Sequence, residues 1–378
     1  MVIGIDIRVL GNKTKSGIEE YTENLLAHLL PLDKNIKFKL FFSSFNSQLP
    51  DYEWLHLPNV ELYKFKIPNK LFFLSSSLFN FPKIDKLMGG VNIFFSPHFF
   101  LTSLSSSCKR VTTFHDLSFV HFPEFFSWRK NIWHNLEMAP KWQAKFSDQI
   151  IAVSESTKKD LINLYGIDPA KIEIIYSGIS PLIKRPSEEK LLEFRKENNL
   201  PERFILFLGK LEPRKNIVGI IKAFNILKRD KRFNNIYLVL AGSRGWLYKD
   251  IFQEIEKSEF KKEIIIKNYI SDEARAFYYS LADVFIYPSF FEGFGFPSLE
   301  AMACGTPVVV SNNSSLPEIV GNGELLVQPN NIQEIAKSIM LILTDNELRD
   351  RLSCFGLQRS AKFNWHKTAE YTLKYIKE

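Results

Sequence analysis

Candidate strands and helices alternate twice along this chain of 378 residues. In the first half, apolar stretches typical of buried strands are separated by helical patterns such as Gly17–Leu30 and Glu155–Tyr165. A second series begins after residue 203. The expected strands are Ile3–Ile7, Ile36–Phe42, Ile93–Phe95, Arg110–Phe114, Gln149–Val153 and Ile172–Ile175, then Phe204–Leu208, Ile236–Ala241, Ile264–Ile266, Val284–Tyr287 and Val308–Ser311. This alternation predicts an α/β fold with two doubly wound, largely parallel sheets.

The composition changes between the two series. Residues 180–201 are polar and charged and contain three prolines, which is typical of a linker. We therefore expect an N-terminal Rossmann-like domain over residues 1–185, a similar C-terminal domain over 186–363, and an amphipathic helix within 364–378. The two sheets are expected to face each other across a cleft, because doubly wound sheets bind ligands beyond the carboxyl ends of their strands.

Composition favours an intracellular protein that does not span a membrane. Apolar residues make up 45% and charged residues 24% of the chain, as in ordinary globular proteins. The three cysteines are far apart and form no C-x-x-C spacing, which fits a reducing compartment. Met1 leads directly into an expected strand rather than a secretory signal, and no apolar run reaches the ~18 residues of a membrane span. We expect a cytoplasmic location.

The net charge of +7 leaves several partners open. Residues 1–185 hold 22 basic and 17 acidic residues, so most of the excess lies in the first half. A positively charged surface suits anionic lipid, nucleic acid or phosphorylated substrates. The small surplus of basic residues disfavours nucleic acid. Aromatic residues also gather over 71–82, 94–101 and 119–133, and they interleave with basic residues or histidine in the last two of these segments. These segments are read either as a peripheral membrane face or as core and acceptor-pocket walls; the second is favoured, because none is a clean amphipathic helix.

Two carboxylates eight positions apart mark the strongest motif. Glu292 precedes a turn containing Gly293 and Gly295, and Glu300 lies within the short helix that follows. That helix has Pro297 at its start and Gly305 at its end, which are the preferred residues at those positions. A glycine turn that opens a helix offers free backbone N–H groups to a phosphate, and a carboxylate one turn further on can reach hydroxyl groups. The pattern predicts a sugar-nucleotide site.

A basic turn follows the first strand of the second series. Gly209 is followed by Lys210, Arg214 and Lys215, directly before a helix. Cations at this place would stabilise the charge that develops on a departing diphosphate. No D-x-D triplet occurs in the sequence, which favours protein cations over a metal ion as partners of the diphosphate, so no metal is predicted.

Single residues at strand ends complete the set. His115 follows the strand Arg110–Phe114 and could contact a sugar hydroxyl or the developing positive charge, although an isolated histidine is more often structural. Gly242 is expected to line the nucleotide site, Trp246 to pack at a loop, and Cys304 to be a packed small side chain rather than a nucleophile.

Together these residues resemble the retaining glycosyltransferases of family four, which have the two-Rossmann GT-B fold. The resemblance covers nearly the whole chain. It is carried by Gly4–Asp6, Ser16–Ile18, Phe114–Leu117, Ala152–Thr157, Lys210–Asn216, Tyr269–Asp272, the Glu292/Glu300 pair and Trp365–Glu370. The glycine pattern near residue 17 departs from the family's doubled glycine.

The resemblance implies a role for each site residue. Glu300 would hold the ribose, Glu292 and His115 would face the reacting sugar, and Tyr269 and Ile270 would neighbour the base. Lys210 and Lys215 match the family's diphosphate-binding cations, with Arg214 as a third. The remaining expected donor-binding residues are Gly17, Gly209, Gly242, Gly293, Phe294, Gly295, Phe296, Ser298 and Leu299. The last helix would cross back to the first domain.

The sequence thus predicts a retaining, metal-independent transferase that moves a hexose from a nucleoside diphosphate sugar to a glycan or lipid-linked glycan in surface polysaccharide synthesis. Similarity of Glu212–Asn216 and Ser314–Glu318 to mannosyltransferases makes GDP-mannose the first donor expected, ahead of a UDP-sugar, and no further cofactor is expected. Peripheral contact with an anionic membrane stays open. The alternatives are an epimerase or phosphorylase on the same fold and a non-catalytic sugar-nucleotide binder. Nicotinamide chemistry is disfavoured, because no G-x-G-x-x-G follows the first strand.

Overall fold

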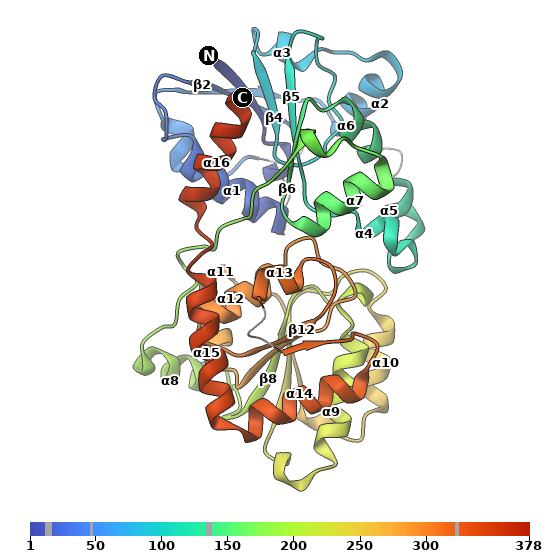
Figure 1. The fold of residues 1–378 in the computed structure, drawn as a ribbon, viewed down its shortest axis with the longest axis vertical. Helices are drawn as coiled ribbons and strands as arrows, with labels where there is room; N and C mark the ends of the chain where they lie inside the picture. Colours follow the sequence, from blue (N-terminus) through green and yellow to red (C-terminus); the bar gives the residue numbers. More distant parts are fainter. Residues whose placement is uncertain (12–16, 46–47, 134–137, 322–324) are drawn as a thin grey trace. The chain divides into compact units, whose positions relative to one another are not determined.

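The computed structural model describes residues 1–11, 17–45, 48–133, 138–321 and 325–378. Contacts within the chain divide it into two compact units (Figure 1). Unit 1 comprises Met1–His121, Trp128–Gly178 and Asn364–Glu378, and unit 2 comprises Phe122–Ser127 and Ile179–Phe363. The chain therefore changes unit after Gly178, whereas the sequence suggested a boundary at 185/186, and the short segment Phe122–Ser127 belongs with unit 2.

Unit 1 is built on a parallel sheet of seven strands in the order β3-β2-β1-β4-β5-β6-β7. The strands are β1 (Val2–Asp6), β2 (Lys37–Ser43), β3 (Val60–Phe65), β4 (Ile93–Ser96), β5 (Lys109–Phe114), β6 (Gln149–Ala152) and β7 (Ile172–Ile174). Its helices are α1 (Gly17–Leu29), α2 (Asn69–Phe79), α3 (Ile84–Leu87), α4 (Ser118–His121), α5 (Trp128–Ile132), α6 (Pro140–Phe146), α7 (Glu155–Tyr165) and α16 (Trp365–Lys377).

The last helix, α16, lies along α1 in unit 1 (Figure 1). Thr368 Oγ1 donates to the carbonyl oxygen of Tyr176 at 2.8 Å, and the Trp365 and Tyr21 rings meet edge to face at 5.7 Å. Trp365, Ala369, Leu373 and Ile376 are buried, as the amphipathic pattern predicts. The C-terminal end of the chain thus completes the core of the N-terminal unit.

Unit 2 contains a parallel sheet of six strands in the order β10-β9-β8-β11-β12-β13. They are β8 (Phe204–Leu208), β9 (Tyr237–Ala241), β10 (Ile264–Lys267), β11 (Val284–Tyr287), β12 (Val308–Ser311) and β13 (Leu325–Val327). The helices are α8 (Glu188–Glu197), α9 (Ile217–Lys228), α10 (Lys249–Lys257), α11 (Asp272–Leu281), α12 (Phe296–Ala303), α13 (Leu316–Val320), α14 (Ile332–Thr344) and α15 (Asn346–Ser360).

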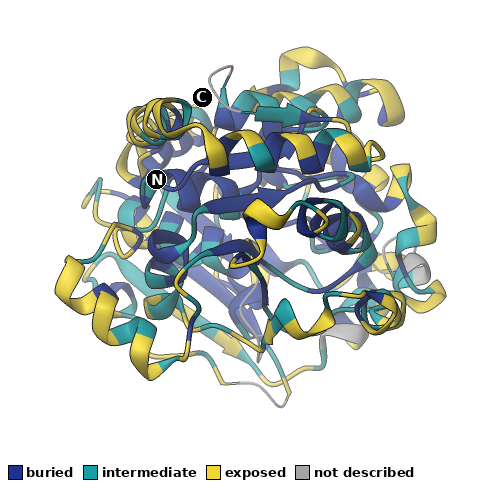
Figure 2. Cartoon of the chain, turned by 90° about the horizontal axis from the view of Figure 1, so that it is seen from below, coloured by how far each residue is buried: buried dark blue, intermediate teal, exposed yellow. Residues whose placement is uncertain are grey.

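Helices cover both faces of the unit 2 sheet. Helix α9 packs against α10 and α14, whereas α12 packs against α11 and α15. The central strands β8, β11 and β12 are buried along their full length, and the buried residues gather on the sheets in Figure 2. This burial on both faces explains why these strands are continuous apolar runs in the sequence. Within the described residues, no helix is long and apolar enough to cross a bilayer.

The predicted α/β fold with two Rossmann-like domains is confirmed, and the expected strands and the helix at Glu155–Tyr165 are found close to where the sequence placed them. Several elements were missed, among them α8, which lies within the stretch 180–201 that was predicted as a linker. The edge strand β3 alternates charged and apolar residues, and β13 has three residues only. Helix α2 was not recognised as a helix, because its apolar residues lie on two opposite sides: Phe72 is buried, whereas Leu71, Leu74 and Leu78 are exposed.

The segment Phe122–Ser127 packs on loops of unit 2. Phe122 lies against Phe291 with ring centroids 6.2 Å apart, and Phe125 lies against Phe290 at 5.2 Å. The Trp246 indole N–H donates to the carbonyl oxygen of Phe125. Phe290 and Phe291 directly precede Glu292, so these aromatic contacts support the loop that carries the first motif glutamate.

Two glycines allow β8 and β9 to end side by side. Gly209 and Gly242 follow the two strands and adopt φ values of 157° and 139°. The Gly209 N–H donates to the carbonyl oxygen of Ala241 at 2.9 Å. A Cβ atom on Gly242 would lie 2.0 Å from the Gly209 oxygen, which no side chain can tolerate. Because these two glycines have no side chains, the basic turn after β8 can lie close to the end of β9.

We predict that Gly242→Ala lowers the free energy of unfolding of unit 2 by about 3 kcal/mol, through backbone strain together with the steric clash. Gly305→Ala is the matched control, since Gly305 has a φ of 78° but a Cβ there would meet its nearest atom at 3.4 Å. The control should lose about 1 kcal/mol from strain alone. Urea unfolding curves of both variants measure the difference, and equal losses would contradict the proposed clash.

Candidate active site

The centre of the candidate site is a buried ion-pair cluster at the carboxyl ends of β8 and β11. Lys215 Nζ lies 2.6 Å from Glu292 Oε1 and donates to the Tyr287 hydroxyl at 2.5 Å. Arg214 Nη1 lies 3.3 Å from the other Glu292 oxygen, and Arg214 Nη2 lies 3.0 Å from Glu212 Oε1. Two of the predicted diphosphate-binding cations therefore meet one of the two predicted catalytic residues.

The charges of this cluster depend on one another. Burial lowers the pKa of Lys215, and the neighbouring Arg214 lowers it further, whereas Glu292 opposes the shift. For Glu292 burial acts to raise the pKa, but Lys215 and Arg214 outweigh it and hold the pKa below its ordinary value. Burial raises the pKa of Tyr287 well above its ordinary range, so its hydroxyl stays protonated. Glu292 is thus a carboxylate held between two cations.

A tight turn places the two cations. Pro213–Lys215 form one turn of 3₁₀ helix, and Asn216 follows in the left-handed conformation with a φ of 56°. The Asn216 amide donates to the carbonyl oxygens of Pro288 and Pro329 at 3.2 and 2.6 Å. This side chain ties the turn to the loop after β11 and so fixes the separation between Lys215 and Glu292. Asparagine suits the position because it tolerates the left-handed region.

Serine side chains after β12 hold the glycine-rich loop. Ser314 Oγ accepts from the backbone N–H of Glu292 at 3.0 Å. Ser315 Oγ contacts the carbonyl oxygens of Glu292 and Phe294 at 2.9 and 3.1 Å. Phe291 and Phe294 are buried. These serine contacts therefore fix the backbone around Glu292. The orientation of the loop depends on its tertiary contacts and not on the turn sequence alone.

The loop leads directly into α12. Gly295 is the N-cap residue with a φ of 100°, and a Cβ there would lie 2.5 Å from Leu316. The helix begins at Phe296, with Pro297 in its first turn, and Gly305 follows the C-cap with a φ of 78°. The first turn of a helix leaves backbone N–H groups without partners inside the helix and carries the positive end of the helix dipole. Ser298 Oγ is buried here without a hydrogen-bond partner among the described residues.

The second motif glutamate, Glu300, is buried on α12 and held by α11. Its Oε1 lies 2.6 Å from Arg275 Nη1, and its Oε2 accepts from the Tyr279 hydroxyl at 2.8 Å. Arg275 also lies 3.3 Å from Asp272. Burial raises the pKa of Tyr279 well above its ordinary value, and the charge of Glu300 adds to the effect. Glu300 therefore has a fixed orientation before any ligand is bound.

The other predicted residues of unit 2 lie on the same sheet edge but differ in accessibility. Tyr269 is exposed and Ile270 half-buried in the loop between β10 and α11. Lys210 is half-buried and makes no ion pair with any residue that the structure describes, so it does not join the cluster. The Leu299 side chain is wholly buried, so only its backbone is left to contact a ligand.

Two of the predicted site residues, His115 and Gly17, belong to unit 1. His115 follows β5, its Nε2 lies 2.8 Å from the Pro97 carbonyl oxygen, and its ring meets Tyr21 edge to face at 4.8 Å. Burial lowers the pKa of His115, and a carbonyl oxygen only accepts hydrogen bonds. The neutral ring therefore carries its proton on Nε2 and keeps a lone pair on Nδ1. Gly17 is the first residue of α1, and Lys15 and Ser16 lie outside the described residues.

Sequence reasoning missed the partners that orient the two glutamates. Arg275 and Tyr279 are four residues apart on α11, a spacing that places them on one helix face. That spacing within a predicted helix was an available signal, but nothing local indicated that α12 would cover this face. Tyr287 and Ser315 read as ordinary strand and loop residues. Their roles depend on contacts with Lys215 and with the glycine-rich loop.

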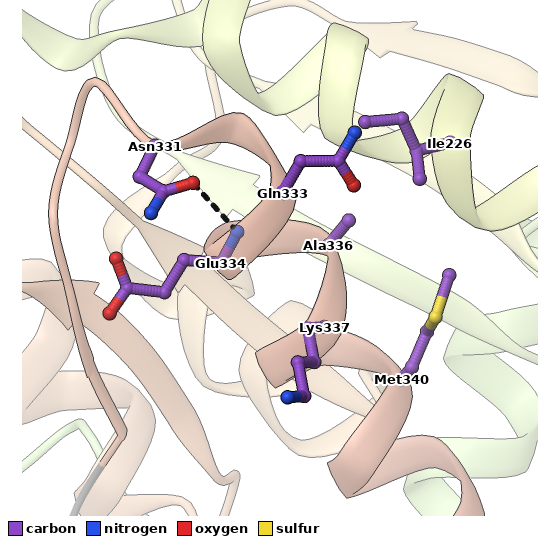
Figure 3. Close-up of a pocket in the computed structure, with 7 residues that line it drawn as sticks. All are labelled: Ile226, Asn331, Gln333, Glu334, Ala336, Lys337 and Met340. Carbon is purple, nitrogen blue, oxygen red and sulfur yellow. Dashed lines mark hydrogen bonds between the residues drawn. The ribbon is translucent and has the colours of Figure 1, made fainter.

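The described residues offer neither a metal site nor a second pocket with catalytic groups beside this cluster. In the part of the chain that the structure describes, no group of three or more His, Cys, Asp and Glu side chains is arranged to hold a metal ion. A shallow hollow of about 510 Å³ lies between α9 and α14 (Figure 3). Ile226, Ala336 and Met340 line it, and Asn331 beside them accepts from the Glu334 N–H in an ordinary helix cap. The hollow contains no predicted site residue.

Comparisons with known proteins agree with these features. Residues 15–181 match the family described as Glycosyltransferase Family 4, and residues 189–359 match the family described as Glycosyl transferases group 1. The chain is 33% identical over 286 residues to O-antigen chain mannosyltransferase B of Escherichia coli, a match that covers 75% of this chain and 74% of the relative.

Solved structures share the fold. Sucrose-phosphate synthase of Thermosynechococcus elongatus superposes with a TM-score of 0.79 at 22% identity, over 100% of this chain and 98% of that one. HepE of Anabaena, solved with UDP and glucose, superposes with a TM-score of 0.74 at 18% identity, over 100% and 99% of the two chains. The GT-B fold predicted from the sequence is thereby confirmed. With matching motifs in both halves and a mannosyltransferase relative over three quarters of its length, this chain belongs to glycosyltransferase family 4.

Proposed function

We propose that this glycosyltransferase moves mannose from GDP-mannose to a hydroxyl group of a glycan or lipid-linked glycan, with retention of configuration and without a metal ion. The observation that carries the proposal is the buried cluster of Lys215, Arg214 and Glu292 beside the N-terminus of α12. The similarity to an O-antigen chain mannosyltransferase supports the choice of mannose and a role in surface polysaccharide synthesis. The widely spaced, unpaired cysteines fit a cytoplasmic enzyme.

In this proposal, unit 2 binds the donor through three features. Glu300, already oriented by Arg275 and Tyr279, accepts hydrogen bonds from the ribose hydroxyls. Lys215, Arg214 and the first backbone N–H groups of α12 bind the diphosphate, with Lys210 available as a third cation. Tyr269 and Ile270 lie next to the base. The buried hydroxyl of Ser298 gives the site one more polar group without a partner within the described residues.

The proposed reaction needs no covalent enzyme intermediate. The bond between the sugar C1 and the diphosphate oxygen breaks, and GDP leaves with that electron pair. The acceptor oxygen bonds to C1 on the same face, and its proton passes to the departing diphosphate. Lys215 and Arg214 stabilise the charge on GDP, while Glu292 and the neutral His115 orient the sugar. Cations fixed in advance in a buried site serve this step without rearrangement.

The function is tested by incubating the purified chain with GDP-mannose and a mannose-containing oligosaccharide in the presence of EDTA. We expect an extended glycan whose new linkage has the α configuration of the donor, as read by NMR, and a rate that EDTA does not change. UDP-glucose serves as the donor control and should yield less product. Donor conversion without an acceptor would identify an epimerase, a requirement for phosphate would identify a phosphorylase, and binding without GDP release would exclude catalysis.

We predict that Glu292→Gln lowers kcat at least ~100-fold, because the site loses a group that orients the sugar. GDP should bind no more weakly than before, since Lys215 and Arg214 are released from the carboxylate and remain available to the diphosphate. Steady-state kinetics and calorimetric titration with GDP measure the two effects. The control is Glu212→Gln, which removes a buried carboxylate from the same arginine and should retain most of the activity. Unchanged turnover in Glu292→Gln would remove this residue from the site.

We predict that Glu300→Gln weakens GDP binding by about tenfold or more, the usual value of a hydrogen bond to a charged group. Tyr279→Phe removes a hydrogen bond that orients Glu300 but no contact to the ligand, so it should weaken binding about fivefold or less. Wild-type protein should bind 2′-deoxy-GDP more weakly than GDP, and Glu300→Gln should bind the two alike. A variant that still prefers GDP over the deoxy form would contradict a ribose-binding role for Glu300.

A further inference from the structure

A short segment from the first half of the sequence is part of unit 2. The chain belongs to unit 1 up to His121 and again from Trp128, whereas Phe122–Ser127 between them belongs to unit 2. We call this segment the strap. It contacts two separate loops of unit 2, the loop after β11 and the loop after β9. Both loops follow strands whose carboxyl ends form the edge of the sheet that carries the candidate site.

The local sequence of the strap places its aromatic rings together. Pro123–Phe125 form one turn of 3₁₀ helix, and the Phe125 N–H donates to the carbonyl oxygen of Phe122 at 3.1 Å. Residues three positions apart lie above one another in such a helix. The rings of Phe122 and Phe125 accordingly stack, with centroids 5.3 Å apart and an angle of 13° between their planes. The strap thus presents one continuous aromatic surface.

This aromatic surface meets the loop after β11 at the residues that precede Glu292. The strap rings lie against the rings of Phe290 and Phe291, with centroids 5.2 and 6.2 Å apart. The backbone of the same two residues is tied to Arg214. The Phe290 N–H donates to the Arg214 carbonyl oxygen at 2.9 Å, and Arg214 Nη1 donates to the Phe291 carbonyl oxygen at 2.6 Å. A shift of either ring would therefore disturb both Glu292 and the arginine that lies beside it.

The loop after β9 holds the other side of the strap. The Trp246 indole N–H donates to the carbonyl oxygen of Phe125, and the Trp246 ring stacks on Phe126 with centroids 5.4 Å apart. This loop is in turn tied to the basic turn, because the Gly245 N–H donates to the Leu211 carbonyl oxygen at 3.0 Å and the Leu211 N–H donates back to the loop at 2.9 Å. The strap therefore reaches the basic turn from two sides, through the loop after β11 and through the loop after β9.

We propose that Phe125 and Trp246 are positioning residues for the transfer of the sugar. Phe125 acts through Phe290 on the backbone before Glu292, and Trp246 acts by holding Phe125 in place. Together they keep the Glu292 carboxylate and the Arg214 guanidinium in one arrangement before the donor binds. The consequence for the rate rests on the proposed function of Glu292, whereas the bracing of the loop does not.

The first test is kinetic. Phe125→Ala should lower kcat for transfer from GDP-mannose by about tenfold or more, because small displacements of an orienting group are costly to the rate. The affinity for GDP should change by less than about threefold, since Glu300 is oriented by α11 and Arg214 keeps its pair with Glu212. Phe125→Tyr retains the ring and should restore kcat to within about twofold of wild type. Steady-state kinetics and calorimetric titration with GDP measure these effects.

The second test needs no donor. The N–H groups of Phe290 and Glu292 are hydrogen-bonded to the Arg214 carbonyl oxygen and to Ser314 Oγ. Phe125→Ala should speed amide hydrogen exchange in a peptide over residues 288–294 by about tenfold or more, with the amides of β8 unchanged as the internal reference. Trp246→Phe keeps an aromatic ring but lacks the N–H donor. It should speed the same exchange severalfold, and it tests the strap even if Phe125→Ala does not fold.

Phe260→Ala is the matched control. Phe260 is a half-buried ring of unit 2 that precedes β10 and lies 6.0 Å from Lys228 Nζ at the end of α9, which places it at the opposite edge of the sheet. This variant should keep the wild-type kcat and exchange rate. Wild-type values in Phe125→Ala, or equal losses in Phe125→Ala and Phe260→Ala, would overturn the proposal. Faster exchange in Phe125→Ala of a chain that transfers no mannose would support the bracing and contradict the proposed function alone.

Discussion

The ion pair between Lys215 and Glu292 governs the arrangement of the candidate site. Burying a carboxylate and two cations costs several kcal/mol for each ion unless the charges are paired and hydrogen-bonded. Here Glu292 accepts from Lys215 and lies beside Arg214, Tyr287 accepts a further hydrogen bond from Lys215, and Glu212 pairs with Arg214. The turn after β8 and the loop after β11 are therefore bound to each other electrostatically. In the proposed reaction, a diphosphate joins this cluster as a further anion, so the cations are in position before the donor arrives.

The scaffold around the pair consists of backbone positions where only certain residues fit. Gly209 and Gly242 let two strand ends meet, Gly295 lets the loop turn into α12 against Leu316, and Asn216 joins the basic turn to two prolines. Ser314 and Ser315 then fix the backbone around Glu292. Each contact removes freedom from a loop that a binding site needs in one conformation. Glu300 is fixed in the same way, by Arg275 and Tyr279 on the neighbouring helix.

The family matches cover both units, over residues 15–181 and 189–359. Unit 1 contributes His115, whose neutral ring is set by burial and by the Pro97 carbonyl oxygen. It also carries the exposed face of α2, which its own core does not use. His115 and the exposed side of α2 are thus features of unit 1, whereas the buried ion-pair cluster lies entirely in unit 2.

The sequence by itself determined the fold class and supplied the candidate site residues, because strand and helix periodicity and the glycine and proline signals act over short stretches of chain. It grouped Glu292, Glu300, Arg214 and Lys215 in one predicted site, because their motifs follow the carboxyl ends of predicted strands and resemble those of a known family. Only the tertiary structure decided that Lys215 pairs with Glu292 across 77 positions, that Arg275 and Tyr279 hold Glu300, and that Phe122–Ser127 packs with unit 2. It also showed that Lys210 stays outside the cluster and that α2 is a helix with two apolar sides. These outcomes depend on which surfaces meet after folding, and no local pattern in the chain encodes that.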